Sequence, residues 1–178
     1  IFGVRVTPDG VLLDSSGITI SPPPGEQYTP AIAFDGVNYL VIWNQNIGGG
    51  NDYSIYGARV TPGGTVLDPN GISISKYPSY KDWPAITFGE SSYLVIWYDE
   101  RSGLEIYGAR VTPDGRVLDP NGIPITRGTK FHFAPAVAFD QRNFFVVWGE
   151  LESKAPNSTP SSNTEVYGAR VTQSGVVL

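Results

Sequence analysis

One phrase returns four times along this chain of 178 residues, and it limits the possible folds more than any other feature. Each copy has an arginine at the same place, and the copies follow one another at intervals of roughly 50 to 60 residues. Self-similarity at such a period is the signature of a repeat protein. The four copies are IFGVRVTPDG around Arg5, IYGARVTPGG around Arg59, IYGARVTPDG around Arg110 and VYGARVTQSG around Arg170.

Two further markers recur with the same spacing. A proline opens one short apolar run in each repeat, and a tryptophan closes the next run. Agreement at three independent markers is not a coincidence, so the sequence predicts a repeated structural unit. The prolines are Pro30, Pro84 and Pro135, and the tryptophans are Trp43, Trp97 and Trp148.

The pattern within each repeat predicts four short antiparallel β-strands. Short runs rich in β-branched and aromatic side chains alternate with glycine and proline turn signals, and no capped stretch has helical periodicity. In Thr-Pro-Asp-Gly, the proline presets φ for a turn and the glycine accepts a positive φ. Four strands in about 50 residues are typical of a β-propeller blade. We therefore expect an all-β fold of about three and a half four-stranded blades, as an open arc or as part of a larger ring.

The expected boundaries follow these markers. Residues 1–20 would form a half blade, a hairpin of the third and fourth strands, and a proline-rich connection would follow from Ser21 to Thr29. Three fuller blades come next. They are expected at 30–75, 84–126 and 135–178, the last with a low-complexity insertion at 151–164.

The side chains that recur in every repeat are expected to be structural. The second strand is apolar at every position, which suits a sheet covered on both faces, so its tryptophan should pack between blades. The arginines Arg5, Arg59 and Arg110 each precede an aspartate by nine residues. A tight hairpin loop would place the two on one face as an ion pair, whereas a bulged loop would separate them, and the sequence leaves both registers open. Structural roles are predicted for Trp43, Trp97, Trp148, Arg59, Arg110 and Arg170.

Composition excludes several classes of protein. The net charge of −5 disfavours a nucleic-acid partner, because no basic stripe is present to neutralise phosphates. No apolar run approaches the roughly 20 residues of a membrane span, and the absence of cysteine excludes disulfides and thiolate metal sites. Because the chain opens and closes within a repeat and begins at Ile1, we expect a processed product or a fragment whose leader is gone. An extracellular or cell-surface location is expected.

The blade pattern resembles known families. Pro-Ala-x-x-Phe-Asp-Gly, followed by an apolar run and by DERSGLEIY at 99–107, is similar to blades of TolB-like and sialidase-like propellers. It resembles still more closely the tandem repeats of large secreted bacterial proteins. The Ser-x-Asp-x-Gly-x-Thr-Trp box of sialidases is absent, and no arginine triad can be placed. The resemblance therefore implies the propeller fold and carries no activity with it.

A ligand would bind where the variable connections emerge. In a four-stranded blade, the connections before the first strand and after the second emerge on one face, and function tends to lie in such loops. Aromatic side chains gather in these segments and would either stack on sugar rings or plug the ends of the blades. The candidate ligand-binding residues are Tyr28, Trp83, Tyr98, Phe131, His132 and Phe133.

Two residues call for separate interpretation. His132 is the single histidine, with no metal-ligand spacing around it, so a loop or packing role is favoured over catalysis or ligation, and neither a metal nor a cofactor is expected. Asn157 begins an Asn-Ser-Thr sequon in the insertion, which makes it a candidate glycosylation site.

The function that the sequence favours is a non-catalytic extracellular module with a structural, self-assembling (ring or filament) or adhesive role, and no enzymatic activity. The alternative is a glycan-binding module that uses the aromatic loop face, and a sialidase-like hydrolase comes third. The expected partners are further copies of the chain or the rest of a larger propeller, and glycans. Neither nucleic acid nor a membrane span is expected.

Overall fold

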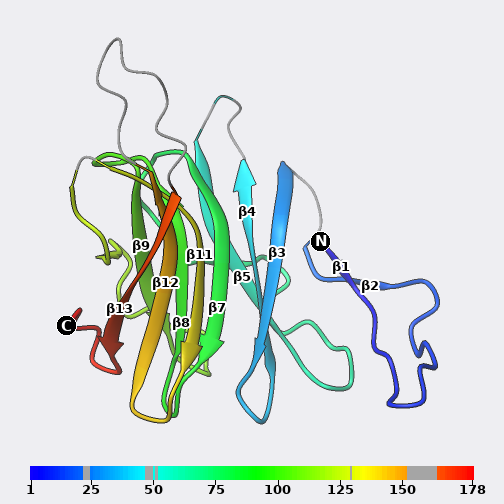
Figure 1. Ribbon diagram of the computed structural model, residues 1–178. Helices are drawn as coiled ribbons and strands as arrows, with labels where there is room; N and C mark the ends of the chain where they lie inside the picture. Colours follow the sequence, from blue (N-terminus) through cyan, green and yellow to red (C-terminus); the bar gives the residue numbers. More distant parts are fainter. Residues whose placement is uncertain (22–24, 47–49, 51, 129, 152–163) are drawn as a thin grey trace.

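The computed structural model describes residues 1–21, 25–46, 50, 52–128, 130–151 and 164–178 (Figure 1). Across these residues, the regular secondary structure consists of β-strands alone. No helix long and apolar enough to cross a bilayer occurs in that part of the chain. The predicted all-β class is thus confirmed.

The strands form one small hairpin and three larger antiparallel sheets, which we call blades. The N-terminal hairpin pairs β1 (Phe2–Gly3) with β2 (Ile18–Thr19). Blade 1 contains β3 (Glu26–Phe34), β4 (Tyr39–Asn46), β5 (Tyr53–Val60) and β6 (Ile72–Ser73). Blade 2 contains β7 (Lys81–Phe88), β8 (Tyr93–Asp99), β9 (Glu105–Val111) and β10 (Ile123–Pro124). Blade 3 contains β11 (Phe131–Phe139), β12 (Asn143–Leu151) and β13 (Thr164–Thr172).

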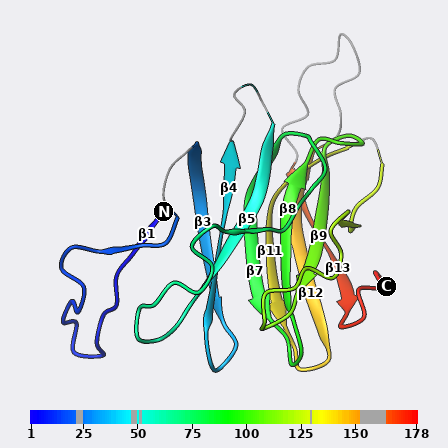
Figure 2. The same ribbon diagram turned by 180° about the vertical axis from the view of Figure 1, so that it is seen from behind.

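The sheets stand beside one another in chain order, with the N-terminal hairpin at one end and β13 at the other (Figures 1 and 2). The first strands β3, β7 and β11 contact one another across the blades, so they lie on the inner side of the arc. The fourth strands are short and form the outer side. This arrangement is that of a partial β-propeller.

Apolar side chains from both faces of the second strands β4 and β8 hold the sheets together, whereas β12 buries one face against blade 2. Leu40 and Ile42 of β4 belong to the core between blades 1 and 2, whereas Val41 and Trp43 belong to the core beside the N-terminal hairpin. The equivalent strand β8 divides its side chains in the same way between two cores. The strands β4 and β8 are therefore buried on both faces, and the three recurring tryptophans lie in these cores.

The first strand of each blade contains a bulge just before the recurring proline. The ladder between β3 and β4 shifts register between Tyr28 and Ala31, and the shift recurs in blades 2 and 3. Because proline has no N–H to donate, a bulge lets the strand continue past it. Residues 26–29 therefore belong to β3, and the prediction that the connection extends to Thr29 was wrong.

Three of the four recurring arginines form ion pairs, which resolves the register that the sequence left open. Arg59 Nε lies 2.8 Å from Asp68 Oδ2 and its Nη2 lies 2.9 Å from Oδ1, a bidentate geometry. Its Nη1 donates to Pro113 O in the next blade at 3.4 Å. The same arrangement recurs at Arg5 with Asp14 and at Arg110 with Asp119, so each arginine joins its own hairpin to the neighbouring blade.

Candidate functional site

Seven aromatic rings form a continuous row at the end of the blades where β3, β7 and β11 begin, the upper end in Figure 1. We call this set the aromatic row. Neighbouring ring centroids lie 5.4 to 6.4 Å apart, a distance typical of interacting aromatic pairs. The row crosses all three blades. Its members are Tyr28, Tyr53, Tyr80, Trp83, Tyr98, Phe131 and Phe133.

Trp83 lies between Tyr98 and Phe133 in the row, and its backbone conformation is unusual. It lies in the bulge of β7 with φ = 48°, in the left-handed region that a bulky residue rarely adopts. Thr29 and Ala134, the residues at the same place in the other blades, have nearly the same φ. A conformation of this kind costs on the order of 1–2 kcal/mol and recurs at functional sites. Among the four tryptophans, Trp83 alone is exposed, at 39%, whereas the others are at most 9% exposed.

Asp82 supplies a fixed carboxylate beside this ring. Its Oδ1 accepts hydrogen bonds from Asn44 Nδ2 at 3.1 Å, from the Thr29 hydroxyl at 3.4 Å and from the Trp83 amide at 2.7 Å. Its Oδ2 accepts a hydrogen bond from the Tyr80 hydroxyl at 3.2 Å. Because the donors come from blades 1 and 2, the carboxylate is held in one orientation at the boundary between them.

Glu100 is a second carboxylate at the row. It accepts a hydrogen bond from the Tyr98 hydroxyl at 2.9 Å. Burial raises the pKa of Tyr98, and the hydrogen bond to Glu100 raises it further, so the phenol stays protonated and continues to donate. At the blade 1 end, Glu26 raises the pKa of Tyr28 mainly through its negative charge. Carboxylates thus accompany the row along its length.

A buried polar layer lies next to the row. The Asp99 carboxylate accepts hydrogen bonds from Arg101 Nε at 2.9 Å, from the Ser79 hydroxyl at 2.6 Å and from Trp97 Nε1 at 2.8 Å. Burial would raise the pKa of Asp99, but these hydrogen bonds outweigh burial and lower it. Arg101 is nearly buried against Asp99 and stacks over the rings of Tyr77 and Tyr107.

The lysine side chains described near the row form hydrogen bonds or ion pairs within the protein. Lys81 is fully buried, and its Nζ donates to backbone carbonyls, among them Tyr53 O and Ser79 O, both at 3.2 Å. Burial lowers the pKa of Lys81 to about 8. Lys130 pairs with Glu150 at 2.6 Å. Among the residues that the structure describes, a ligand lying on the row would therefore meet carboxylates rather than free positive charge.

The structure places His132 in a buried position between blades 2 and 3. Its Nδ1 lies 3.3 Å from Glu105 Oε2 and 2.9 Å from Leu104 O, and its Nε2 lies 3.3 Å from Glu150 Oε2. The side chain therefore links two blades and does not reach the exposed surface of the row. Within the described residues, no group of three or more histidine, cysteine, aspartate or glutamate side chains has a geometry that could hold a metal ion.

The aromatic row contains five of the six ligand-binding candidates, all except His132. The predicted candidates did not include Tyr53, Tyr80, Asp82 or Glu100, although Tyr80 and Asp82 stand in the same variable segment as Trp83. Aligning the repeats on their prolines would have found two of these, because Tyr80 aligns with Phe131, and Asp82 with Tyr28 and Phe133. Tyr53 begins β5 directly after the connection from β4, where the copies differ in length. Asn157 lies outside the described residues.

Comparison with known proteins identifies the fold. No known protein family matches the sequence, and no curated protein is similar to it. An alpha-L-arabinofuranosidase from Lactobacillus brevis superposes with a TM-score of 0.61 at 13% identity, over 88% of this chain and 56% of that one. A sucrose-6-phosphate hydrolase from Lactobacillus gasseri superposes with a TM-score of 0.56 at 12% identity, over 96% of this chain and 40% of that one. The fold is propeller-like. The chain thus spans about half the length of these structures.

These matches correct two expectations. Both solved structures are glycosidases with a β-propeller fold. The prediction of a non-catalytic structural, self-assembling or adhesive module without enzymatic activity was therefore wrong. The finer likeness to TolB-like or sialidase-like blades is not shown by these structures, whereas the propeller-like all-β fold is.

Proposed function

We propose that this chain forms part of a carbohydrate-processing β-propeller and that the aromatic row is its sugar-binding face. The observation that carries the proposal is Trp83, an exposed ring held in a strained bulge beside Tyr98 and Phe133, at 5.5 and 6.4 Å between centroids. Small-molecule sites are lined mainly by apolar and aromatic side chains with a few fixed polar groups, and Asp82 and Glu100 are such groups here. The names of the two matched glycosidases support a sugar as the ligand.

The charge along the row favours a neutral sugar. Glu26, Asp82 and Glu100 lie beside its rings. An anionic sugar such as a sialic acid or a sugar phosphate would be repelled by like charge, because the neighbouring cations are already paired or buried. The net charge of −5 acts in the same direction over longer distances. We therefore expect neutral pentose or hexose oligosaccharides rather than acidic ones.

Hydrolysis of a glycosidic bond generally requires a pair of carboxyl groups, one as general acid and one as nucleophile or base. Asp82 and Glu100 are the candidate pair that the row contains. Asp82 is the stronger candidate, because hydrogen bonds hold its carboxylate in one orientation beside the exposed ring of Trp83.

Tryptophan fluorescence tests sugar binding directly, because Trp83 is the exposed tryptophan. Titration with neutral arabino- or fructo-oligosaccharides should shift the emission and protect it from acrylamide quenching, with saturation. Sialylated or phosphorylated sugars should have little effect. Calorimetry on Trp83→Ala should show binding lost, whereas Tyr167→Ala, which removes an exposed ring outside the row, should bind normally. Equal binding by both variants would refute the proposed face.

Release of reducing sugar tests the catalytic part separately. The chain, or a longer form that contains it, should cleave a neutral oligosaccharide, and Asp82→Asn should reduce the rate by a factor of at least about 100 while binding persists. Binding without cleavage in every form tested would remove the catalytic role of Asp82 and leave the sugar-binding face standing.

A further inference from the structure

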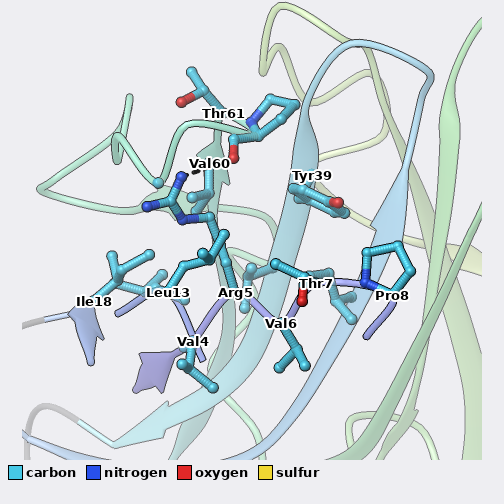
Figure 3. Close-up of a pocket in the computed structure, with 16 residues that line it drawn as sticks. Val4, Arg5, Val6, Thr7, Pro8, Leu13, Ile18, Tyr39, Val60 and Thr61 are labelled. Carbon is cyan, nitrogen blue, oxygen red and sulfur yellow. Dashed lines mark hydrogen bonds between the residues drawn. The ribbon is translucent and has the colours of Figure 1, made fainter. Parts of the chain in front are cut away.

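A hollow of 480 Å³ separates the N-terminal hairpin from blade 1 (Figure 3). Aliphatic side chains line it from both sides, including Val6 and Ile18 of the hairpin and Ile32 and Val60 of blade 1. Its charged lining residue, Arg5, is already paired with Asp14. The hollow is therefore an apolar site.

The outer half of this boundary is built like the boundary between blades 1 and 2. Arg5 Nη1 donates to Pro62 O at 3.4 Å, as Arg59 donates to Pro113 O. The backbone of the hairpin also matches, since Ile1 O accepts hydrogen bonds from the amides of residues 20 and 21 just as Ile55 O does from residues 74 and 75. The hairpin is thus seated on blade 1 as the outer half of a blade.

The inner half is where the two boundaries differ. Between blades 1 and 2, the inner strands β3 and β4 supply Ala31, Ala33, Leu40 and Ile42, which pack against blade 2. There Ile86 and Phe88 of β7 are partly buried in that core. Their counterparts in blade 1 are Ile32, which is 58% exposed, and Phe34, which is 44% exposed. The hollow occupies the place that two inner strands fill one blade further along.

A strand edge and a tyrosine at this boundary lack, among the described residues, the inner-strand partner that their counterparts have one blade further along. In the described chain β1 pairs with β2 alone, so its other edge is open, whereas β5 and β9 pair on both edges. Tyr93 donates its hydroxyl to Asn38 O, in the turn between β3 and β4, at 3.1 Å. Tyr39 stands at the counterpart position and lies beside the hollow (Figure 3). An inner hairpin seated here would pair with β1 and offer its turn carbonyl to Tyr39.

We propose that the hollow binds a β-hairpin with the inner-strand pattern of this chain's own repeats. The guest would carry small side chains on its first strand, as at Ala31 and Ala33, and large aliphatic ones on its second, as at Leu40 and Ile42. Strand addition to β1 gives the backbone hydrogen bonds, and the apolar lining selects the side chains. Neither step depends on sugar binding.

A tethered guest tests the proposal. A second copy of residues 30–43 (PAIAFDGVNYLVIW) is joined to Ile1 through a flexible glycine–serine linker, which gives a high local concentration. The matched control carries aspartate in the guest at the two positions copied from Leu40 and Ile42. We expect at least about tenfold slower hydrogen exchange in β1 and a higher urea midpoint with the first guest, and neither change with the control.

A host variant and an untethered peptide separate the other outcomes. Ile32→Asp in the host should abolish the effect of the tethered guest, because that side chain lines the hollow. The same hairpin with lysine tails for solubility, added to the unaltered chain, should protect β1 in a saturable manner. Equal protection by guest and control, no protection by either peptide form, or protection that instead follows dimer formation by whole chains would overturn the proposal.

Discussion

Blades 2 and 3 carry the same strand pattern but differ greatly in how much of it they bury. Ile106 in β9 is fully buried, whereas Val166, at the same place in β13, is 76% exposed. Leu94 in β8 is also fully buried, and its counterpart Phe145 in β12 is 47% exposed. The repeat therefore determines which positions are apolar, and the neighbouring blade determines whether that apolar surface leaves water. Equivalent substitutions in the two blades should thus have unequal effects.

The largest difference is expected for the core. Leu94→Ala in blade 2 should lower the free energy of unfolding by about 2–5 kcal/mol, because it empties a fully buried site. Phe145→Ala on the open face of blade 3 should cost less than about 1 kcal/mol. Urea denaturation of both variants measures the two losses. Similar losses would mean that a partner covers blade 3 in solution.

The arginines give the next largest contrast. Arg59→Ala should cost about 1.5–3 kcal/mol, because it leaves Asp68 without its bidentate partner and removes the link to Pro113 O. Arg170→Ala should change stability by no more than about 0.5 kcal/mol, since Arg170 is exposed. Thermal unfolding of both variants, with Arg116→Ala as an exposed control, checks this ranking. A costly Arg170→Ala would contradict it.

The lowered pKa values of paired carboxylates predict how the stability of the fold depends on pH. Hydrogen bonds from Arg5 lower the pKa of Asp14 to about 2, and the net effect of its partners lowers the pKa of Asp99. A carboxylate with a lowered pKa in the folded state stabilises the fold above its unfolded pKa, and this contribution is lost as the pH falls through the folded pKa. The urea midpoint should therefore drop between about pH 4 and pH 2. Asp99→Asn should flatten the drop more than Asp9→Asn, an exposed control. An unchanged slope in Asp99→Asn would be evidence against this role.

The sequence predicts the β-sheet framework of this molecule better than it predicts the candidate site. The spacing of Arg59, Arg110 and Arg170 was sufficient for the all-β propeller-type fold, because a repeat can bury its apolar strands only against another repeat. The ion-pair register was not predictable, since it depends on the backbone of one turn. The likeness to two β-propeller glycosidases was also not predictable from the sequence, because the identity to them is only 12–13%.

Within the site, the sequence identified most rings but not their arrangement. Trp83 and Phe133 were recognised as loop aromatics, yet the bulge that turns Trp83 outward depends on a left-handed φ, which no residue type at that position signals. Asp82 belongs to no motif that the sequence shows. Its importance arises from donors on blade 1 that are far away in the sequence, Thr29 and Asn44.

The smallest contrast concerns the indole N–H groups. Trp97 Nε1 donates to Asp99 Oδ2 at 2.8 Å, whereas the buried Trp148 Nε1 has no hydrogen-bond partner among the described residues. Glu150, two residues after Trp148, pairs with Lys130 instead. Trp97→Phe should therefore cost about 1 kcal/mol more than Trp148→Phe. Equal losses in urea denaturation would show that the Trp148 indole also has a partner in solution.

A crystal structure of the chain soaked with a neutral oligosaccharide is the most direct test of the central claim, that the aromatic row receives a sugar. The account predicts a sugar ring stacked on Trp83, with its hydroxyl groups within hydrogen-bond distance of Asp82 or Glu100. Sugar bound at saturating concentration anywhere other than the aromatic row, or no bound sugar at all, would contradict it.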